Sequence, residues 1–156
     1  MDNQQSKTYR QFWFVGFMDG EGSFLLMKQS TCKKYAPSIK VAGTDFLTLE
    51  DIKGILKENG VPFYVEVRKP KVDKHKPSWM VVVKGHKRCK AFFEAFPPVY
   101  FKTKNYEATD LYSFILSRSR KTQKEDYDTT EQVLIENLRN KSVRLAFNDY
   151  TPASMV

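Results

Sequence analysis

Hydrophobic and polar residues recur with two different periods along the chain, and each change of period marks a new element. Residues 8–20 are apolar nearly all round, which is typical of a helix that is buried on most sides. Segments 24–29 and 38–42 then alternate apolar with polar positions, as half-buried strands do. A helix capped by Thr44 or Asp45 follows, and its apolar stripe is Phe46, Leu49, Ile52, Ile55 and Leu56.

The second half of the chain shows the same two periods. Segments 63–68 and 78–84 predict another strand pair, joined by a basic loop. Thr129 and Gln132 form a possible capping box for the last helix. The helices expected after these strands cover 87–96, 105–118 and 129 to about 141.

The predicted order is therefore α-β-β-α-β-β-α-α-α, an α+β fold. Two hairpins with one apolar face each would join in one antiparallel four-stranded sheet covered by helices. No long linker or internal repeat interrupts the pattern. We expect a single domain over residues 1–156, with a core of about 9–140 and a frayed tail over 148–156.

Charge narrows the choice of partner. A net charge of +8 on 156 residues favours a polyanionic partner, although a basic protein that is merely soluble would look the same. Cys32 and Cys89 lie far apart, which argues against a disulfide framework or a zinc site. No apolar run has the length of a membrane span, and the first residues lack a signal peptide, so we expect an intracellular protein.

The segment 14–22, FVGFMDGEG, carries the candidate chemistry. Gly16 and Gly20 lie on one helix face, where each glycine costs about 1 kcal/mol relative to alanine. Such a pair suggests close approach of another backbone. Asp19 and Glu21 oppose the helix dipole, which a divalent cation would explain. The alternative is a buried helix with a glycine cap and solvated acids.

This segment resembles the LAGLIDADG motif of homing endonucleases, with GEG in place of the terminal ADG. Segments 41–60 and 99–115 and the element order are also similar to that family. The resemblance implies an αββαββα core with a saddle-shaped sheet and additional C-terminal helices. It also implies an intron-encoded homodimer that hydrolyses a long pseudo-palindromic double-stranded DNA target by a two-metal mechanism.

The resemblance assigns roles to individual residues. Glu21, at the eighth motif position, would bind the catalytic Mg²⁺ (or Mn²⁺ or Ca²⁺), and Gly20 would contribute backbone there. Asp19 would be structural. Lys104 would lie near the scissile phosphate, with Lys102 as a weaker candidate, although Lys104 also suits an ordinary helix start. Gly43 stands where the family often has a water-positioning glutamine, a role that Thr44, Asp45 or ordered water would take over.

One motif per chain implies that the second metal-binding acid comes from a second chain. In the family, two motif helices pack side by side, which gives a C₂ dimer. The interface residues expected here are Phe12, Val15, Gly16, Asp19 and Gly20.

Strand alternation predicts which side chains face DNA in the major groove. These are Gln29, Lys34, Ser38, Lys40, Tyr64, Glu66, Arg68, Met80 and Lys84. Basic loop residues would contact phosphates instead, namely Lys71, Lys74, Arg118, Arg120 and Lys121. For any one of them, the alternative is an ordinary solvated residue.

Two other functions remain open. One is a non-cleaving nucleic-acid binder of the same fold, such as an intron RNA maturase or a repressor. The other is a basic structural domain without metal dependence. The sequence identifies neither the DNA target nor the host, which could be an organelle, a prokaryote or a phage.

Overall fold

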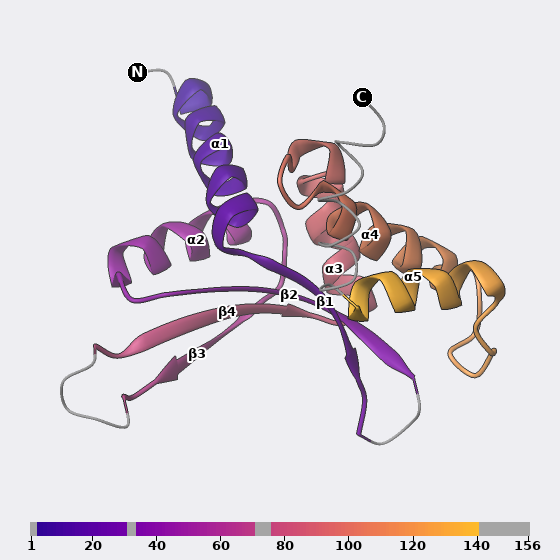
Figure 1. The fold of residues 1–156 in the computed structure, drawn as a ribbon. Helices are drawn as coiled ribbons and strands as arrows, with labels where there is room; N and C mark the ends of the chain where they lie inside the picture. Colours follow the sequence, from indigo (N-terminus) through magenta and orange to yellow (C-terminus); the bar gives the residue numbers. More distant parts are fainter. Residues whose placement is uncertain (1–2, 31–33, 71–75, 141–156) are drawn as a thin grey trace, which may run out of the picture.

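A computed structural model describes residues 3–30, 34–70 and 76–140 (Figure 1). The predicted order of helices and strands is confirmed, with one short 3₁₀ turn added before α4. The elements are α1 (Asn3–Glu21), β1 (Ser23–Lys28), β2 (Tyr35–Gly43), α2 (Phe46–Glu58), β3 (Tyr64–Arg68), β4 (Ser78–Lys84), α3 (His86–Ala95), η1 (Pro98–Tyr100), α4 (Asn105–Ser119) and α5 (Thr129–Arg139). The expected tail over 148–156 lies outside the described residues.

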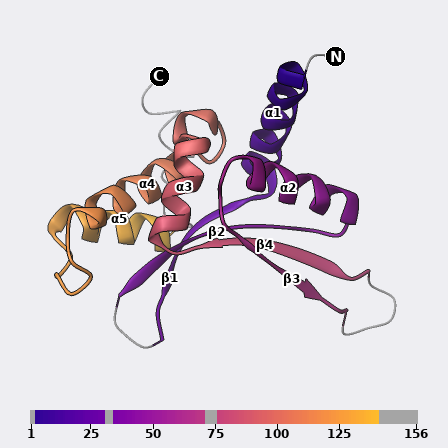
Figure 2. The same cartoon turned by 180° about the vertical axis from the view of Figure 1, so that it is seen from behind.

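The four strands form one antiparallel sheet in the order β1-β2-β4-β3. Its two central strands, β2 and β4, come from different hairpins and pair with each other, with Ile39 opposite Val83. This pairing joins the two hairpins into one sheet. The helices all lie on one face of this sheet, and none of the described elements covers the opposite face (Figures 1 and 2). The predicted α+β class and the single joined sheet are therefore confirmed.

The core lies between the sheet and the helices and is rich in phenylalanine. Phe24 of β1 packs edge-on against Phe101 at 5.1 Å between ring centroids, and Phe14 of α1 lies 4.9 Å from Phe96. Such tilted ring pairs add to the free energy gained by burying the rings. The core anchors the C-terminal half of α1 and so fixes where the motif ends.

The expectation that α1 is buried on most sides is wrong for the described chain. Phe14 and Met18 are buried, but Phe12 is 71% exposed and Tyr9 is 66% exposed. The helix projects from the body of the molecule, and only one of its sides meets the sheet and α2 (Figure 1). A large apolar surface on α1 is consequently left without a covering element among the described residues.

Charged groups gather between α4 and α5, in what we call the α4–α5 charge cluster: Ser117, Arg118, Lys121, Asp128 and Glu131. The Glu131 carboxylate has no exposed surface and accepts hydrogen bonds from Ser117 Oγ (2.9 Å), Lys121 Nζ (2.9 Å) and the backbone N–H of Asp128 (3.0 Å). Arg118 Nη1 lies 3.4 Å from it. Burial by itself would raise the pKa of Glu131, but these partners outweigh it and hold that pKa below its usual value.

Two local predictions need correction, and a third is confirmed. The capping box at α5 consists of Asp128 and Glu131, one residue before the expected pair of Thr129 and Gln132. Phe46 was expected in the buried stripe of α2, but it lies at the first helical position and is largely exposed. At the same helix start, the expected cap is present, because the Asp45 side chain accepts a hydrogen bond from the Leu47 N–H.

Candidate functional site

The end of α1 is held by contacts that only glycine permits. The Gly22 N–H donates to Met18 O at 2.9 Å. A Cβ atom at Gly22 would lie 2.6 Å from that same oxygen, which is too close for any side chain. Glycine after the helix therefore lets the chain turn directly from α1 into β1, and Glu21 becomes the last helical residue.

Asp19 ties the end of α1 to the start of α4. Its carboxylate accepts hydrogen bonds from the backbone N–H groups of Thr103 and Lys104, each at 2.9 Å. Burial pushes the pKa of Asp19 up, but these two hydrogen bonds and the Lys104 charge outweigh it and lower that pKa. The contacts explain an acid at the unfavourable end of a helix dipole and support the structural role expected for Asp19.

Lys104 completes the same junction from the other side. Its ammonium group donates to the carbonyl oxygens of Asp19 (2.9 Å) and Gly20 (3.0 Å). Both carbonyls belong to the last turn of α1, where they lack partners within the helix. The structure thus brings Lys104 to the helix end that carries Glu21, whereas Lys102 is exposed and makes no described polar contact.

Glu21 is exposed, and no described residue pairs with its carboxylate. Within residues 3–30, 34–70 and 76–140, no group of three acidic, histidine or cysteine side chains gathers around it or elsewhere. Its chemistry fits Mg²⁺, which prefers a few carboxylate or carbonyl oxygens and keeps several waters. The Gly20 carbonyl is a weaker candidate than expected, because the Lys104 ammonium already occupies one side of it.

The exposed side of α1 forms a continuous apolar surface, which we call the α1 face: Tyr9, Phe12, Trp13, Gly16 and Gly20. All five residues are exposed, and no atom of the described residues lies within 4 Å of a Cβ atom built on either glycine.

The expected interface overlaps the α1 face only in part. Phe12, Gly16 and Gly20 belong to both, whereas Val15 packs against the core and Asp19 is held by the start of α4. Sequence reasoning missed Tyr9 and Trp13. Extending the helical spacing backward from Gly16 and Gly20 would have found them, because they share that side of the helix.

The free face of the sheet is hollowed between the two hairpins. The hollow has a volume of about 360 Å³. Lys28, Lys40 and Lys84 lie along it, and no described carboxylate pairs with them. The remaining lining residues are Met27, Gln29, Ser30, Ala36, Ser38 and Tyr64.

Most residues expected on this face are there. Tyr64, Glu66, Arg68 and Lys84 are exposed, and Lys40 and Met80 are partly exposed.

Ser38 is a correction to the predicted DNA contacts. It lies between Leu25 and Lys84 on neighbouring strands and is 1% exposed, so it is not available to a partner in this conformation. Lys28 was missed. Alternation from Phe24 assigned Lys28 to the covered face, but β1 ends there and the side chain lines the hollow.

Other basic residues assigned to DNA are engaged within the chain. Arg118 belongs to α4 rather than to a loop and is buried, and Lys121 joins it in the α4–α5 charge cluster. Lys34 donates to Glu125 O at 2.8 Å and lies over the Tyr127 ring, on the helix side of the sheet. Their charges are therefore matched internally.

Three further residues were predicted to contact DNA phosphates, and the structure describes one of them. Arg120 is exposed at the end of α4. Lys71 and Lys74 lie outside the described residues.

Of the two side chains expected to take the water-positioning role at Gly43, that of Asp45 is already engaged elsewhere. A Cβ atom at Gly43 would lie 2.5 Å from the Trp79 ring, so this position admits no side chain unless that indole moves. The Asp45 carboxylate accepts hydrogen bonds from the Leu47 N–H and Thr48 Oγ1 at the start of α2. Asp45 is thus committed to capping, and Thr44 is the exposed alternative.

Comparisons with known proteins identify the fold. No protein-family model and no curated protein sequence matches the chain. The homing endonuclease I-CvuI, solved in complex with its target in the presence of calcium, is 18% identical with a TM-score of 0.54, and the match covers 88% of this chain and 96% of that one.

Two further structures are named as LAGLIDADG enzymes. The meganuclease I-AabMI, bound to uncleaved DNA, is 14% identical with a TM-score of 0.59 over 88% of this chain and 48% of that one. The homing endonuclease I-LtrWI, bound to target DNA, is 22% identical with a TM-score of 0.55 over 80% of this chain and 42% of that one. The chain therefore has the LAGLIDADG endonuclease fold, and it spans about half the length of these two proteins.

In the part of the chain that the structure describes, no helix is long and apolar enough to cross a membrane.

Proposed function

We propose that this chain is a LAGLIDADG homing endonuclease that acts as a homodimer on a long double-stranded DNA site with divalent metal. The observation that carries the proposal is the position of Glu21. This exposed carboxylate ends the helix that presents the open α1 face, and the glycine-bounded turn after it leads directly into the sheet.

The α1 face supports the homodimer. Burial of aromatic side chains such as Phe12 and Tyr9 favours association, and glycines at 16 and 20 allow a second backbone to approach closely. A second copy related by a two-fold axis would bring the two α1 helices together and place both Glu21 residues near that axis. The match to 96% of I-CvuI but only 48% of I-AabMI agrees with a unit that works in pairs.

The hollowed sheet face supports DNA binding. Lys28, Lys40 and Lys84 line it without described counter-charges, which favours a phosphate backbone, and exposed Tyr64 and Arg68 offer contacts to base edges. I-AabMI and I-LtrWI were both solved bound to DNA. In a dimer, two such sheets would cover neighbouring half-sites, so the target would be a pseudo-palindrome of roughly two helical turns.

The residues at the end of α1 have different roles in the proposed reaction. A divalent metal held by the Glu21 carboxylates would activate water and stabilise the leaving oxygen. Lys104 places its ammonium group beside this site, held by two carbonyls, where it would stabilise charge on the scissile phosphate. Asp19 positions Lys104 through its hydrogen bonds to the start of α4.

Selection of cleaved sites tests this function. A randomised duplex library is incubated with the full chain and Mg²⁺, and the cut fragments are captured and sequenced. We expect one pseudo-palindromic family of sites, and no cutting when the metal is chelated. If the protein enriches one site by binding but never cuts it in Mg²⁺ or Mn²⁺, the non-cleaving alternative of a maturase or repressor replaces this proposal.

A further inference from the structure

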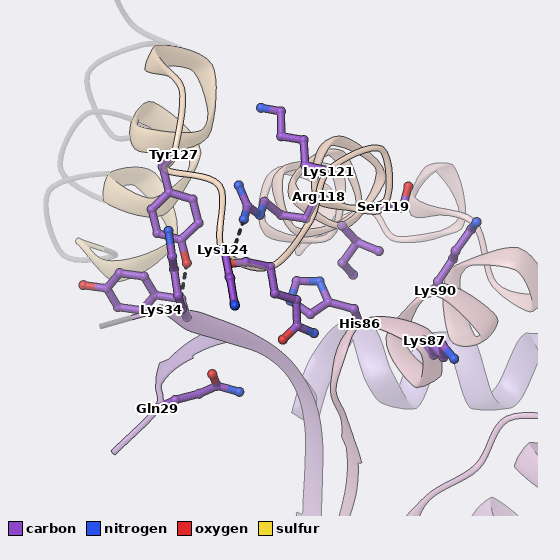
Figure 3. Close-up of a pocket in the computed structure, with 13 residues that line it drawn as sticks. Gln29, Lys34, His86, Lys87, Lys90, Arg118, Ser119, Lys121, Lys124 and Tyr127 are labelled. Carbon is purple, nitrogen blue, oxygen red and sulfur yellow. Dashed lines mark hydrogen bonds between the residues drawn. The ribbon is translucent and has the colours of Figure 1, made fainter. Parts of the chain in front are cut away.

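A second cavity lies on the helix side of the sheet, away from the end of α1 (Figure 3). Its volume is about 700 Å³. It is bounded by the ends of β1 and β2, the first turn of α3, the last turn of α4 and the segment 120–128. The proposed cleavage reaction uses none of these walls.

The walls carry cations whose charge is not matched. Lys87 and Lys90 reach the cavity from α3 and Lys124 from the segment after α4, and no described carboxylate pairs with them. Arg118 and Lys121 also line it, but their two charges are balanced by Glu131 and Asp128. Among the described residues that line the cavity there is no aspartate or glutamate, so the cavity favours an anion with more than one charge.

The start of α3 adds polar donors to the same wall. Gly85, with φ of 98°, precedes the helix and contributes no side-chain hydrogen bond to its first turn. The first N–H groups of a helix carry partial positive charge and suit phosphate oxygens. His86 and Lys87 belong to this turn and both line the cavity, so the first turn of α3 forms part of its wall.

The remaining walls are flat or apolar and suit a ring system. Ile115 and Tyr127 line the cavity beside His86, whose imidazole stacks on Phe114 with 6.0 Å between ring centroids. Burial, and secondarily the Arg118 charge, lowers the pKa of His86, which keeps the ring neutral near pH 7. A neutral imidazole and the amide of Gln123 both offer hydrogen bonds to a base edge.

The volume of the cavity favours a nucleotide over a smaller anion. The volume lies within the range of about 300–1,000 Å³ that small organic ligands occupy, and far exceeds what one phosphate ion fills. A DNA duplex is too wide to enter it.

We propose that this cavity binds a nucleoside phosphate, with the base against His86 and Tyr127 and the phosphate attracted by the unpaired lysines of the walls, Lys87, Lys90 and Lys124. The ligand would be either a free nucleotide or an unpaired nucleotide of a DNA single strand. This site goes beyond the proposed function and does not depend on cleavage.

Calorimetric titration of the full chain tests the proposal with four probes: the deoxynucleoside monophosphates, a short 5′-phosphorylated single strand, a duplex without a target site, and inorganic phosphate. We expect saturable binding of a monophosphate, of the single strand, or of both. Binding of the monophosphates assigns the site to a free nucleotide. Binding of the strand alone assigns it to an unpaired nucleotide.

Two variants assign the binding to this cavity. Lys87→Ala with Lys90→Ala should weaken it at least about tenfold, because charge-assisted hydrogen bonds to phosphate are lost. Lys124→Glu should weaken it as well, through a separate segment of the wall. The control, Lys53→Ala with Lys57→Ala on α2, removes two charges elsewhere and should leave binding unchanged. Thermal melting and circular dichroism confirm that each variant is folded.

Three results would overturn the proposal. The first is no binding of monophosphate or single strand at millimolar concentration. The second is equal weakening in the α2 control. The third is equal competition by inorganic phosphate or by the duplex, since either would show that no base enters the cavity.

Discussion

Glu131 and Glu21 are both glutamates at helix ends, but the chain treats them in opposite ways. Glu131 has no exposed surface, and both of its carboxylate oxygens accept hydrogen bonds from the α4–α5 charge cluster. Glu21 is exposed at the end of α1, with no ion-pair partner among the described residues. Apolar residues differ in the same way, since Leu111 of α4 is buried whereas Phe12 of α1 is not.

The contrast between the two glutamates distinguishes residues that stabilise the fold from residues available to other molecules. A buried charge with every partner in place is part of the fold, because removing one partner leaves another buried and unmatched. An exposed acid beside an uncovered apolar face gains its partners only from other molecules. Substitutions between α4 and α5 should therefore destabilise the monomer, and those on the α1 face or the free sheet face should affect assembly and DNA while the monomer stays folded.

The largest loss of stability is expected for Glu131→Ala. The variant leaves Arg118 buried without its carboxylate and removes the capping box of α5. The free energy of unfolding should fall by about 3–5 kcal/mol, as it does when a buried ion pair loses one partner. Denaturant unfolding measures it, with Glu136→Ala on the exposed side of α5 as the matched control. A loss similar to that of the control would remove the structural role assigned to the cluster.

Gly16→Leu tests the open α1 face. A Cβ atom at this position has no described atom within 4 Å, and leucine favours a helix over glycine by up to about 1 kcal/mol, so monomer stability should be kept or raised. Overpacking between two helices should cost about 1–3 kcal/mol and weaken the dimer.

Sedimentation velocity at micromolar concentration should therefore find a dimer for the wild type and a shift toward monomer for Gly16→Leu. Thr130→Leu on α5 adds the same side chain elsewhere and should leave the dimer intact. A wild type that is monomeric at that concentration but still cuts DNA contradicts the homodimer.

Lys40→Ala with Lys84→Ala tests the free sheet face. If each lysine neutralises one phosphate, the slope of log K against log salt should become less steep by about 0.9 for each lysine in each chain of the dimer. Fluorescence anisotropy with the selected site, at several salt concentrations, measures that slope. The control is Lys53→Ala with Lys57→Ala on α2. A changed base preference with an unchanged slope would show that these lysines read bases instead.

Asp19→Asn should give the smallest effect, and its size depends on pH. The pKa of Asp19 is lowered in the folded state, so its carboxylate stabilises the fold above the unfolded value of 3.8, and that contribution disappears as pH falls through the lower folded pKa. The wild type should exceed the variant by about 1 kcal/mol near pH 7. The two should converge below pH 3.8 in denaturant unfolding, and a constant difference down to acid pH would rule out the ionised contact.

Local patterns predicted the elements well and the environments of single side chains less well. Strand alternation placed Tyr64 and Lys84 correctly, because period 2 fixes the face. It gave no warning that neighbouring strands cover Ser38, since that burial depends on register between strands. Arg118 was assigned to DNA phosphates as a loop residue, although it ends the predicted helix 105–118 and continues the buried spacing of Leu111 and Ile115 along α4.

The interaction that decides Arg118 comes from a different helix. Its charge is accommodated only because Glu131 lies opposite it, thirteen residues along the chain. Likewise, the motif predicted where Glu21 would lie, but not that Lys104 would hold the carbonyl of Gly20, because that contact joins distant segments. The period of apolar residues predicts which face of one helix or strand is buried. It does not predict contacts between segments that lie far apart in the sequence.

The most direct measurement compares binding with cutting for Glu21→Gln on the selected site, in Mg²⁺. The substitution keeps the size of the side chain and removes the charge that would hold the cation. Affinity for the duplex should be kept or should rise, because a negative charge near phosphate is lost, while nicking and double-strand cleavage fall to background. Glu136→Gln, a matched change on α5, should cut like the wild type. Cleavage by Glu21→Gln at the wild-type rate would contradict the active site proposed at the end of α1.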